Sequence, residues 1–178
     1  MTEQHLATTV STPDGPFSLI VSEGNLLASG FSDDLAALNT LIHPSLRQPI
    51  DQLQQVAAGS DDSRLAPVLS ALSDYYDGDL SAPQRVAVRQ QSGEFRMLAW
   101  DVLRTVPAGH CISYTEYAQR ANRPAAVRAA ASACAMNAAA LFVPCHRVRR
   151  SDGSLGGFRY GLAIKRSLLE REGFLPTA

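Results

Sequence analysis

A chain of 178 residues, 46% of them hydrophobic, is long enough for one sizeable core or for a small domain beside a medium one. No apolar stretch approaches the roughly 20 residues of a membrane span, and residues 1–10 lack the basic start and apolar run of a signal peptide. We therefore expect a cytoplasmic protein without membrane contacts. Three cysteines at spacings that match no zinc pattern predict free thiols, no metal and no other cofactor.

The net charge of −1 conceals an asymmetry between the two halves of the chain. Residues 1–88 carry three basic against eleven acidic residues, a net charge of −8. Residues 89–178 carry thirteen basic against six acidic residues, a net charge of +7, and twelve of the thirteen are arginines. Because arginine suits phosphate recognition, the pattern predicts two domains, 1–88 and 89–178, of which the second binds nucleic acid. The alternative is that the two halves simply attract each other.

The first half predicts a small α/β domain. Three β-type runs within residues 8–32, separated by turns at Pro13-Asp14-Gly15 and at Gly24-Asn25, predict an antiparallel meander. The remaining segments predict, in chain order, a helix over 33–43, a loop or marginal helix over 44–64, a helix from 64 to about Gly78, and a strand or extended linker over 85–90. His5 and His43 are expected on the surface.

The second half is predicted to be mainly helical. Residues 93–106 predict a helix whose buried face is formed by its large apolar side chains, Phe95, Leu98, Trp100 and Leu103. Ser113 and Glu116 have the spacing of a capping box, in which each residue satisfies the other's end of a new helix. A break over 121–123 and Pro124 at a first-turn position predict a further helix up to Met136, and the two short helices have the outline of a helix-turn-helix.

The helix from Pro124 to Met136 consists almost entirely of small residues around one arginine, Arg128. Alanine is the best helix former, so on its own the composition favours a tightly packed core helix. Arg128 changes that interpretation, because a helix face without bulk can approach a DNA groove and place one long cation into the base stack.

Residues 141–148 form an apolar β-type run that contains Cys145, His146 and Arg147. A glycine-rich loop over 149–161 and a helix over 162–173 follow, with Lys165 expected as a solvated helix residue. A thiol becomes a good nucleophile when a neighbouring base or cation removes its proton or lowers its pKa. A Cys-His pair alone also suits a thiol protease or a redox sensor.

Further residues make the interpretation specific. The block Pro144-Cys145-His146-Arg147-Val148, followed by a glycine-rich loop and a Leu-Leu-Glu helix, resembles the signature of the methylated-DNA–protein-cysteine methyltransferases, the alkylguanine-DNA alkyltransferases. Other matching residues occur in the family's order and spacing: Phe95, Trp100, Val106, Pro107, Gly109, Ser113, Tyr114, Arg128, Asn137, Glu172 and Gly173.

The resemblance implies a role for each of these positions. Cys145 is the alkyl acceptor, His146 acts through a water and with Glu172 to make it a thiolate, and Asn137 is a hinge. Tyr114 crowds the target phosphate and donates a proton toward the base, and Arg128 replaces the flipped base in the stack. Ser113 and Ala129 are expected to contact the DNA. The side chains expected to line the substrate pocket are Val148, Leu155, Phe158, Arg159 and Cys134.

The resemblance also implies the architecture and the reaction. The fold is α+β, with a ribonuclease-H-like N-terminal domain containing a small antiparallel sheet and a helical, winged helix-turn-helix C-terminal domain. The activity is single-turnover removal of an alkyl group from 6-O-alkylguanine in double-stranded DNA by a protein that is monomeric or clusters on DNA. A non-enzymatic lesion-binding protein or a winged-helix regulator is the alternative, but such relatives lack the acceptor cysteine.

The sequence departs from the family pattern at two places. Arg159 and Tyr160 stand where relatives have small residues and glycine, which predicts a narrower pocket. Ala138 follows Asn137 where proline is usual, which predicts a looser hinge.

Overall fold

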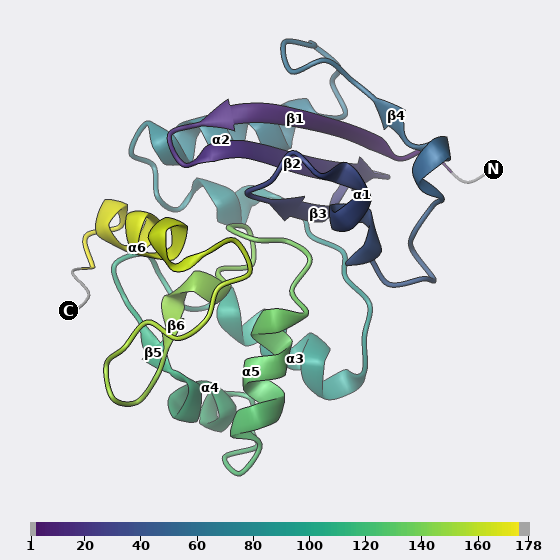
Figure 1. Cartoon of the computed structure of the whole chain (residues 1–178). Helices are drawn as coiled ribbons and strands as arrows, with labels where there is room; N and C mark the ends of the chain where they lie inside the picture. The colour runs from purple at the N-terminus through teal and green to yellow at the C-terminus, as the bar shows by residue number, and fades with distance from the viewer. Residues whose placement is uncertain (1–2, 175–178) are drawn as a thin grey trace. The chain divides into compact units, whose positions relative to one another are not determined.

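The computed structural model describes residues 3–174 and divides into two compact units (Figure 1). The first unit comprises Met1–Gln91 together with Ala138–Phe142, and the second comprises Ser92–Asn137 and Val143–Ala178. The mixture of a small sheet with several helices confirms the predicted α+β class. None of the helices in the described part of the chain has the length and apolar character that crossing a membrane requires.

The first unit is built on the predicted antiparallel meander. It contains β1 (Leu6–Thr12), β2 (Gly15–Ser22) and β3 (Asn25–Gly30), in the sheet order β3-β2-β1-β4. Glu23 and Gly24 both have positive φ angles, 49° and 76°, as a type I′ turn between two strands requires. This turn lies one residue earlier than the sequence predicted.

The edge strand of this sheet was not predicted. β4 (Gln54–Gln55) pairs in parallel with the start of β1, inside the polar stretch that predicted a loop or helix, and the short 3-10 helix η1 (Ile50–Gln52) precedes it. The backbone N–H of Gln54 donates to the carbonyl oxygen of His5 at 2.9 Å. Because β4 covers this end of β1, His5 is buried and the prediction of a surface histidine was wrong, whereas His43 is exposed as expected.

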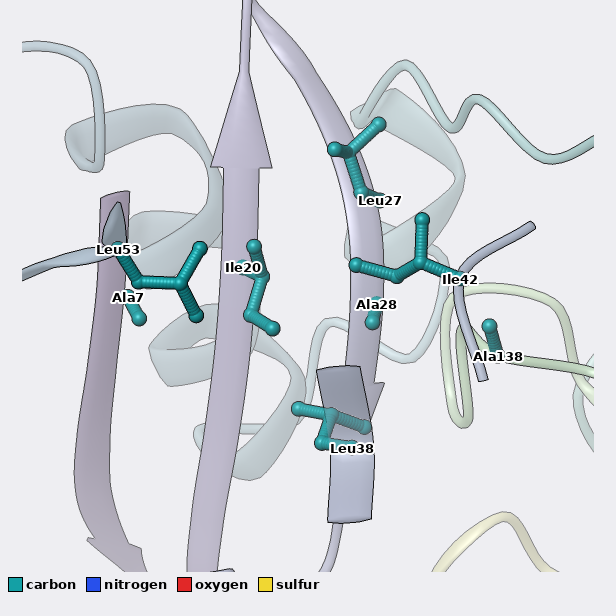
Figure 2. Close-up of a cluster of buried hydrophobic side chains, with 8 residues drawn as sticks. All are labelled: Ala7, Ile20, Leu27, Ala28, Leu38, Ile42, Leu53 and Ala138. Carbon is teal, nitrogen blue, oxygen red and sulfur yellow. The ribbon is translucent and has the colours of Figure 1, made fainter. Parts of the chain in front are cut away.

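The remaining elements of the first unit follow the predicted order. They are α1 (Leu35–Thr40), which Asp34 caps through its side chain, then α2 (Ala66–Tyr76) and the 3-10 helix η2 (Ala82–Arg85). Residues 86–90, one residue shorter than the predicted segment, form an extended linker that touches β3 through a bridge between Leu26 and Val88. Figure 2 shows a buried apolar cluster in this unit, formed by Ala7, Ile20, Leu27, Ala28, Leu38, Ile42, Leu53 and Ala138.

The second unit is mainly helical. Its elements are α3 (Glu94–Leu103), β5 (Ile112–Ser113), α4 (Tyr114–Arg120), α5 (Val127–Ala135), the 3-10 helix η3 (Cys145–Arg147), β6 (Val148–Arg149) and α6 (Leu162–Arg171). Two side chains join the first three helices. The indole Nε1 of Trp100 on α3 donates to the carbonyl oxygen of Ala133 on α5 at 2.9 Å, and the hydroxyl of Tyr117 on α4 donates to that of Ala99 at 2.7 Å.

Several local predictions in this unit need correction. The helix that was predicted to open at Pro124 begins at Val127. Trp100 and Leu103 are buried as predicted, but Leu98 is 38% exposed, and Ala99 lies on the buried face of α3. The capping box forms only by half: Ser113 Oγ accepts from the backbone N–H of Glu116, while the Glu116 carboxylate pairs with Arg120. Residues 141–147 do not form a strand.

Candidate active site

Cys145 begins a tight turn of 3-10 helix rather than lying on an extended strand. Leu141 has a φ of +74°, which lies outside the extended region, so the residues before Cys145 cannot form a continuous strand. The backbone N–H of Cys145 then donates to the carbonyl oxygen of Val143 at 2.8 Å, and that of Arg147 to Pro144 at 3.0 Å. In this turn Cys145, His146 and Arg147 are all buried, so consecutive residues enter the interior together.

His146 and Arg147 share one buried carboxylate, that of Glu172 at the end of α6. The Nε2 atom of His146 lies 2.8 Å from Oε1 of Glu172. The guanidinium of Arg147 donates to both carboxylate oxygens at 3.0 and 2.9 Å and to the carbonyl oxygen of Val106 at 2.7 Å. Sequence analysis predicted the pairing of His146 with Glu172 but assigned no role to Arg147. A charged side chain is normally exposed, so the sequence did not indicate that Arg147 is buried.

The network fixes the charge and tautomer of these groups. Burial tends to raise the pKa of Glu172, but the charge that His146 gains at low pH, the charge of Arg147 and the hydrogen bonds of both outweigh it and hold that pKa at about 2. Burial lowers the pKa of His146 despite the neighbouring carboxylate, so the imidazole is neutral. A neutral ring that donates from Nε2 to Glu172 carries its lone pair on Nδ1. Nδ1 of His146 is buried and has no hydrogen-bond partner among the described residues.

The Cys145 thiol is held by Asn137. Burial raises the pKa of this thiol, and a hydrogen bond with the Asn137 side chain and the positive charge of Lys165 oppose the increase. The Nδ2 atom of Asn137 also donates to the carbonyl oxygen of Val143 at 2.8 Å. The structure thus brings together four of the predicted site residues, Cys145, His146, Glu172 and Asn137.

Lys165 is fully buried, and the prediction of a solvated helix residue was wrong. Its ammonium donates to the carbonyl oxygens of Val148 at 2.7 Å, Leu155 at 2.5 Å and Gly157 at 3.2 Å. Burial lowers the pKa of Lys165, and the nearby cysteines act in the opposite direction. These three carbonyl oxygens replace the water molecules that would hydrate the ammonium in solvent. By binding all three, Lys165 holds the loop that follows β6 in place.

Tyr114 lies against the same loop. A Cβ atom on Gly156 would come within 3.1 Å of the Tyr114 ring and hydroxyl, so the close approach requires glycine there, at a φ of +75°. Burial raises the pKa of Tyr114 to about 12, so its hydroxyl is protonated at neutral pH. Sequence analysis missed Gly156, although the glycine-rich composition of the loop was the available signal.

The loop also carries the residues that depart from the family pattern. The guanidinium of Arg159 donates to the carbonyl oxygen of Ala135 at the end of α5. The rings of Phe158 and Tyr160 meet edge to face, with centroids 5.7 Å apart. Among the other predicted pocket residues, Val148 and Leu155 are buried, and burial raises the pKa of Cys134 well above its ordinary value.

Of the predicted DNA-contact residues, Tyr114 lies against the loop of the site, and the other three lie on α5 and at the start of α4. Arg128 and Ala129 are exposed in the first turn of α5, and Ser113 caps α4. Over residues 3–174, no group of three or more His, Cys, Asp and Glu side chains is placed to hold a metal ion.

Comparison with known proteins gives consistent matches. Residues 94–174 match a family described as the DNA-binding domain of 6-O-methylguanine DNA methyltransferase. The inducible methylated-DNA–protein-cysteine methyltransferase of Bacillus subtilis is 35% identical over 136 residues, 72% of this chain and 75% of the relative. The solved structure of Mycobacterium tuberculosis OGT in complex with DNA is similar with a TM-score of 0.75 and 26% identity, over 97% of this chain and 96% of that one.

A longer relative is also similar. The regulatory protein ada of Salmonella typhimurium is 39% identical over 145 residues, which are 80% of this chain. The chain spans only 38% of the length of that relative.

Proposed function

This chain belongs to the methylated-DNA–protein-cysteine methyltransferase family, and we propose on that premise that it repairs alkylated DNA by direct transfer. The alkyl group moves from the 6-oxygen of guanine in double-stranded DNA to the Sγ atom of Cys145. The observation that carries the proposal is the buried set of Cys145, a neutral His146 and an ionised Glu172. A protein that only binds lesions does not need an acceptor thiol.

The reaction follows from the positions of the protons. In this proposal the proton of the Cys145 thiol passes through a bridging water to Nδ1 of His146, and Glu172 stabilises the imidazolium that forms. The thiolate attacks the alkyl carbon, the bond from that carbon to the guanine oxygen breaks, and its electron pair stays on the base. Tyr114, whose pKa of about 12 keeps it protonated, supplies a proton to the leaving base. The thioether product is stable, so each molecule acts once.

DNA recognition is assigned to α4 and α5. In this proposal residues 89–178 are a winged helix-turn-helix domain, and residues 1–88 are a ribonuclease-H-like supporting domain. The exposed guanidinium of Arg128 fills the gap that the extruded base leaves, while Ala129 and Ser113 lie against the DNA. The side chains of Val148, Leu155, Phe158, Arg159 and Cys134 line the pocket for the extruded base.

The oligomeric state and the compartment are further parts of this proposal. The protein acts on DNA as a monomer in the cytoplasm, and several copies can cluster along one duplex.

The test is mass spectrometry after mixing equimolar protein with a duplex that contains one 6-O-methylguanine. We expect one added methyl group per protein, on the peptide that contains Cys145. Cys145→Ser should bind the duplex without accepting the group, and Cys111→Ser, a matched change at a half-buried thiol, should accept it normally. Binding without any added mass in the unaltered protein would contradict the proposal.

A further inference from the structure

Residues 138–142, the anchor segment, belong to the first unit although the residues on both sides of them belong to the second. The segment runs parallel to β3, with a bridge between Ser29 and Ala139. The Ser29 N–H donates to the carbonyl oxygen of Ala138 at 2.8 Å, and the Ala140 N–H donates to that of Ser29 at 3.1 Å. The Ser29 hydroxyl adds a buried hydrogen bond of 2.7 Å to the carbonyl oxygen of Ala140. One strand residue therefore makes three hydrogen bonds to this segment.

A second side chain of the first unit holds the start of the anchor segment. The backbone N–H of Ala138 donates to Oε1 of Gln90 at 3.0 Å. Proline has no backbone N–H, so alanine at this position supplies a donor that a proline would remove. At the other end, the ring of Phe142 packs near that of Phe17, with centroids 6.3 Å apart. The anchor segment is thus tied at both ends and in the middle, which argues against the looser hinge that Ala138 predicted.

The anchor segment leads directly into the acceptor site on both sides. Asn137 precedes it and makes a hydrogen bond with the Cys145 thiol. Val143 follows it, and its carbonyl oxygen accepts from both Asn137 Nδ2 and the N–H of Cys145, each at 2.8 Å. A shift of the anchor segment therefore moves the atoms that orient the thiol.

We infer that Ser29 is a positioning residue for alkyl transfer, which acts through the backbone of residues 138–142 on Asn137, Val143 and Cys145. The inference rests on the proposed function for the reaction that it affects. The thiolate must line up with the alkyl carbon and the leaving oxygen, and a displacement of about 1 Å can slow such a reaction by up to about 100-fold. Without the Ser29 hydroxyl, the buried carbonyl of Ala140 loses its side-chain donor, and the middle of the segment is held less firmly.

The experiment compares Ser29→Ala with a matched control, Ser18→Ala. Ser18 is also a buried serine of the same sheet, and its hydroxyl donates to a backbone carbonyl, that of Ser32, at 2.6 Å. We measure the single-turnover transfer rate at saturating protein, the affinity for the duplex, and the melting temperature. We expect both variants to lose similar stability, both to bind DNA normally, and only Ser29→Ala to transfer about tenfold more slowly or worse. Ser29→Thr, which keeps the hydroxyl, should restore the rate.

Equal transfer rates for Ser29→Ala and Ser18→Ala would overturn the inference. If Ser29→Ala does not fold, the second variant is Gln90→Met, a change in a half-buried side chain that removes the hydrogen-bond acceptor of the Ala138 N–H. An unchanged transfer rate in Gln90→Met overturns the inference as well. An unaltered protein that transfers nothing contradicts the proposed function instead. In that case the inference is tested by the pH profile of Cys145 labelling by iodoacetamide. A profile displaced in Ser29→Ala but not in Ser18→Ala supports the inference. Coincident profiles overturn it.

Discussion

The carboxylate of Glu172 offers a direct test of the active-site network. Its side chain is fully buried, which raises its pKa, but His146 and Arg147 outweigh burial and bring the pKa from the ordinary 4.5 to about 2. A difference of about 2.5 pKa units corresponds to about 3 kcal/mol of folding free energy. Because the pKa is lower in the folded than in the unfolded state, this stability is present above pH 4.5 and is lost as the pH falls through about 2.

The perturbation is Glu172→Gln, and the assay is urea unfolding from about pH 7 to about pH 3. At neutral pH we expect the variant to be less stable than the unaltered protein by at least about 3 kcal/mol, because Arg147 stays buried without its carboxylate. By about pH 3 the difference should narrow by about 2 kcal/mol, since the unaltered protein has lost most of the contribution by then. Groups that do not interact with Glu172 titrate in both proteins and cancel in the difference.

The control is Glu170→Gln, an exposed carboxylate on the same helix, α6. It should stay within about 0.5 kcal/mol of the unaltered protein at every pH, as surface substitutions do. If the Glu172→Gln and unaltered curves run parallel between pH 5 and pH 3, the network does not hold Glu172 ionised, and the assignment of a neutral His146 with a free Nδ1 fails with it.

Three further substitutions test other parts of the second unit. Arg128→Ala should slow transfer from duplex DNA by about tenfold or more and leave single-stranded DNA and the melting temperature unaffected, in parallel single-turnover and thermal assays. Gly156→Ala places a methyl group 3.1 Å from Tyr114 at a φ of +75°, so single-turnover kinetics should show slower transfer. Lys165→Met leaves three backbone carbonyls without their donor, and urea unfolding should show a loss of about 3 kcal/mol, whereas Arg166→Met, at the next and exposed position, should show almost none.

The sequence predicted those elements whose signals are local. The strands β1 to β3 follow from β-type runs between turn residues, and the start of α4 follows from Ser113, whose hydroxyl caps it. The pairing of His146 with Glu172 was also expected, but from a resemblance rather than from a pattern, because 25 residues separate the two in the chain.

The elements that sequence analysis missed depend on contacts between distant segments. β4 consists of two exposed glutamines, which carry no β pattern and pair only through their backbone. The anchor segment lies against β3 because of hydrogen bonds to Ser29, more than 100 residues earlier in the chain. Lys165 was expected in solvent because a lysine normally is, and only three carbonyls brought together by the fold make its burial tolerable.

The charges around Cys145 suit the single-turnover reaction that we propose. With the pKa of the thiol raised and that of His146 lowered by burial, the resting pair is neutral, and the thiolate appears only when a proton crosses between them. The ionised Glu172 then favours the imidazolium, while Asn137 and Lys165 favour the thiolate, so both products of the proton transfer are stabilised in place. A permanently ionised thiol would react with any electrophile that reached it, and without a way to remove the adduct each such reaction would inactivate a molecule. In the proposed reaction, a neutral resting thiol is therefore preserved for an alkyl group that the DNA presents in the correct alignment.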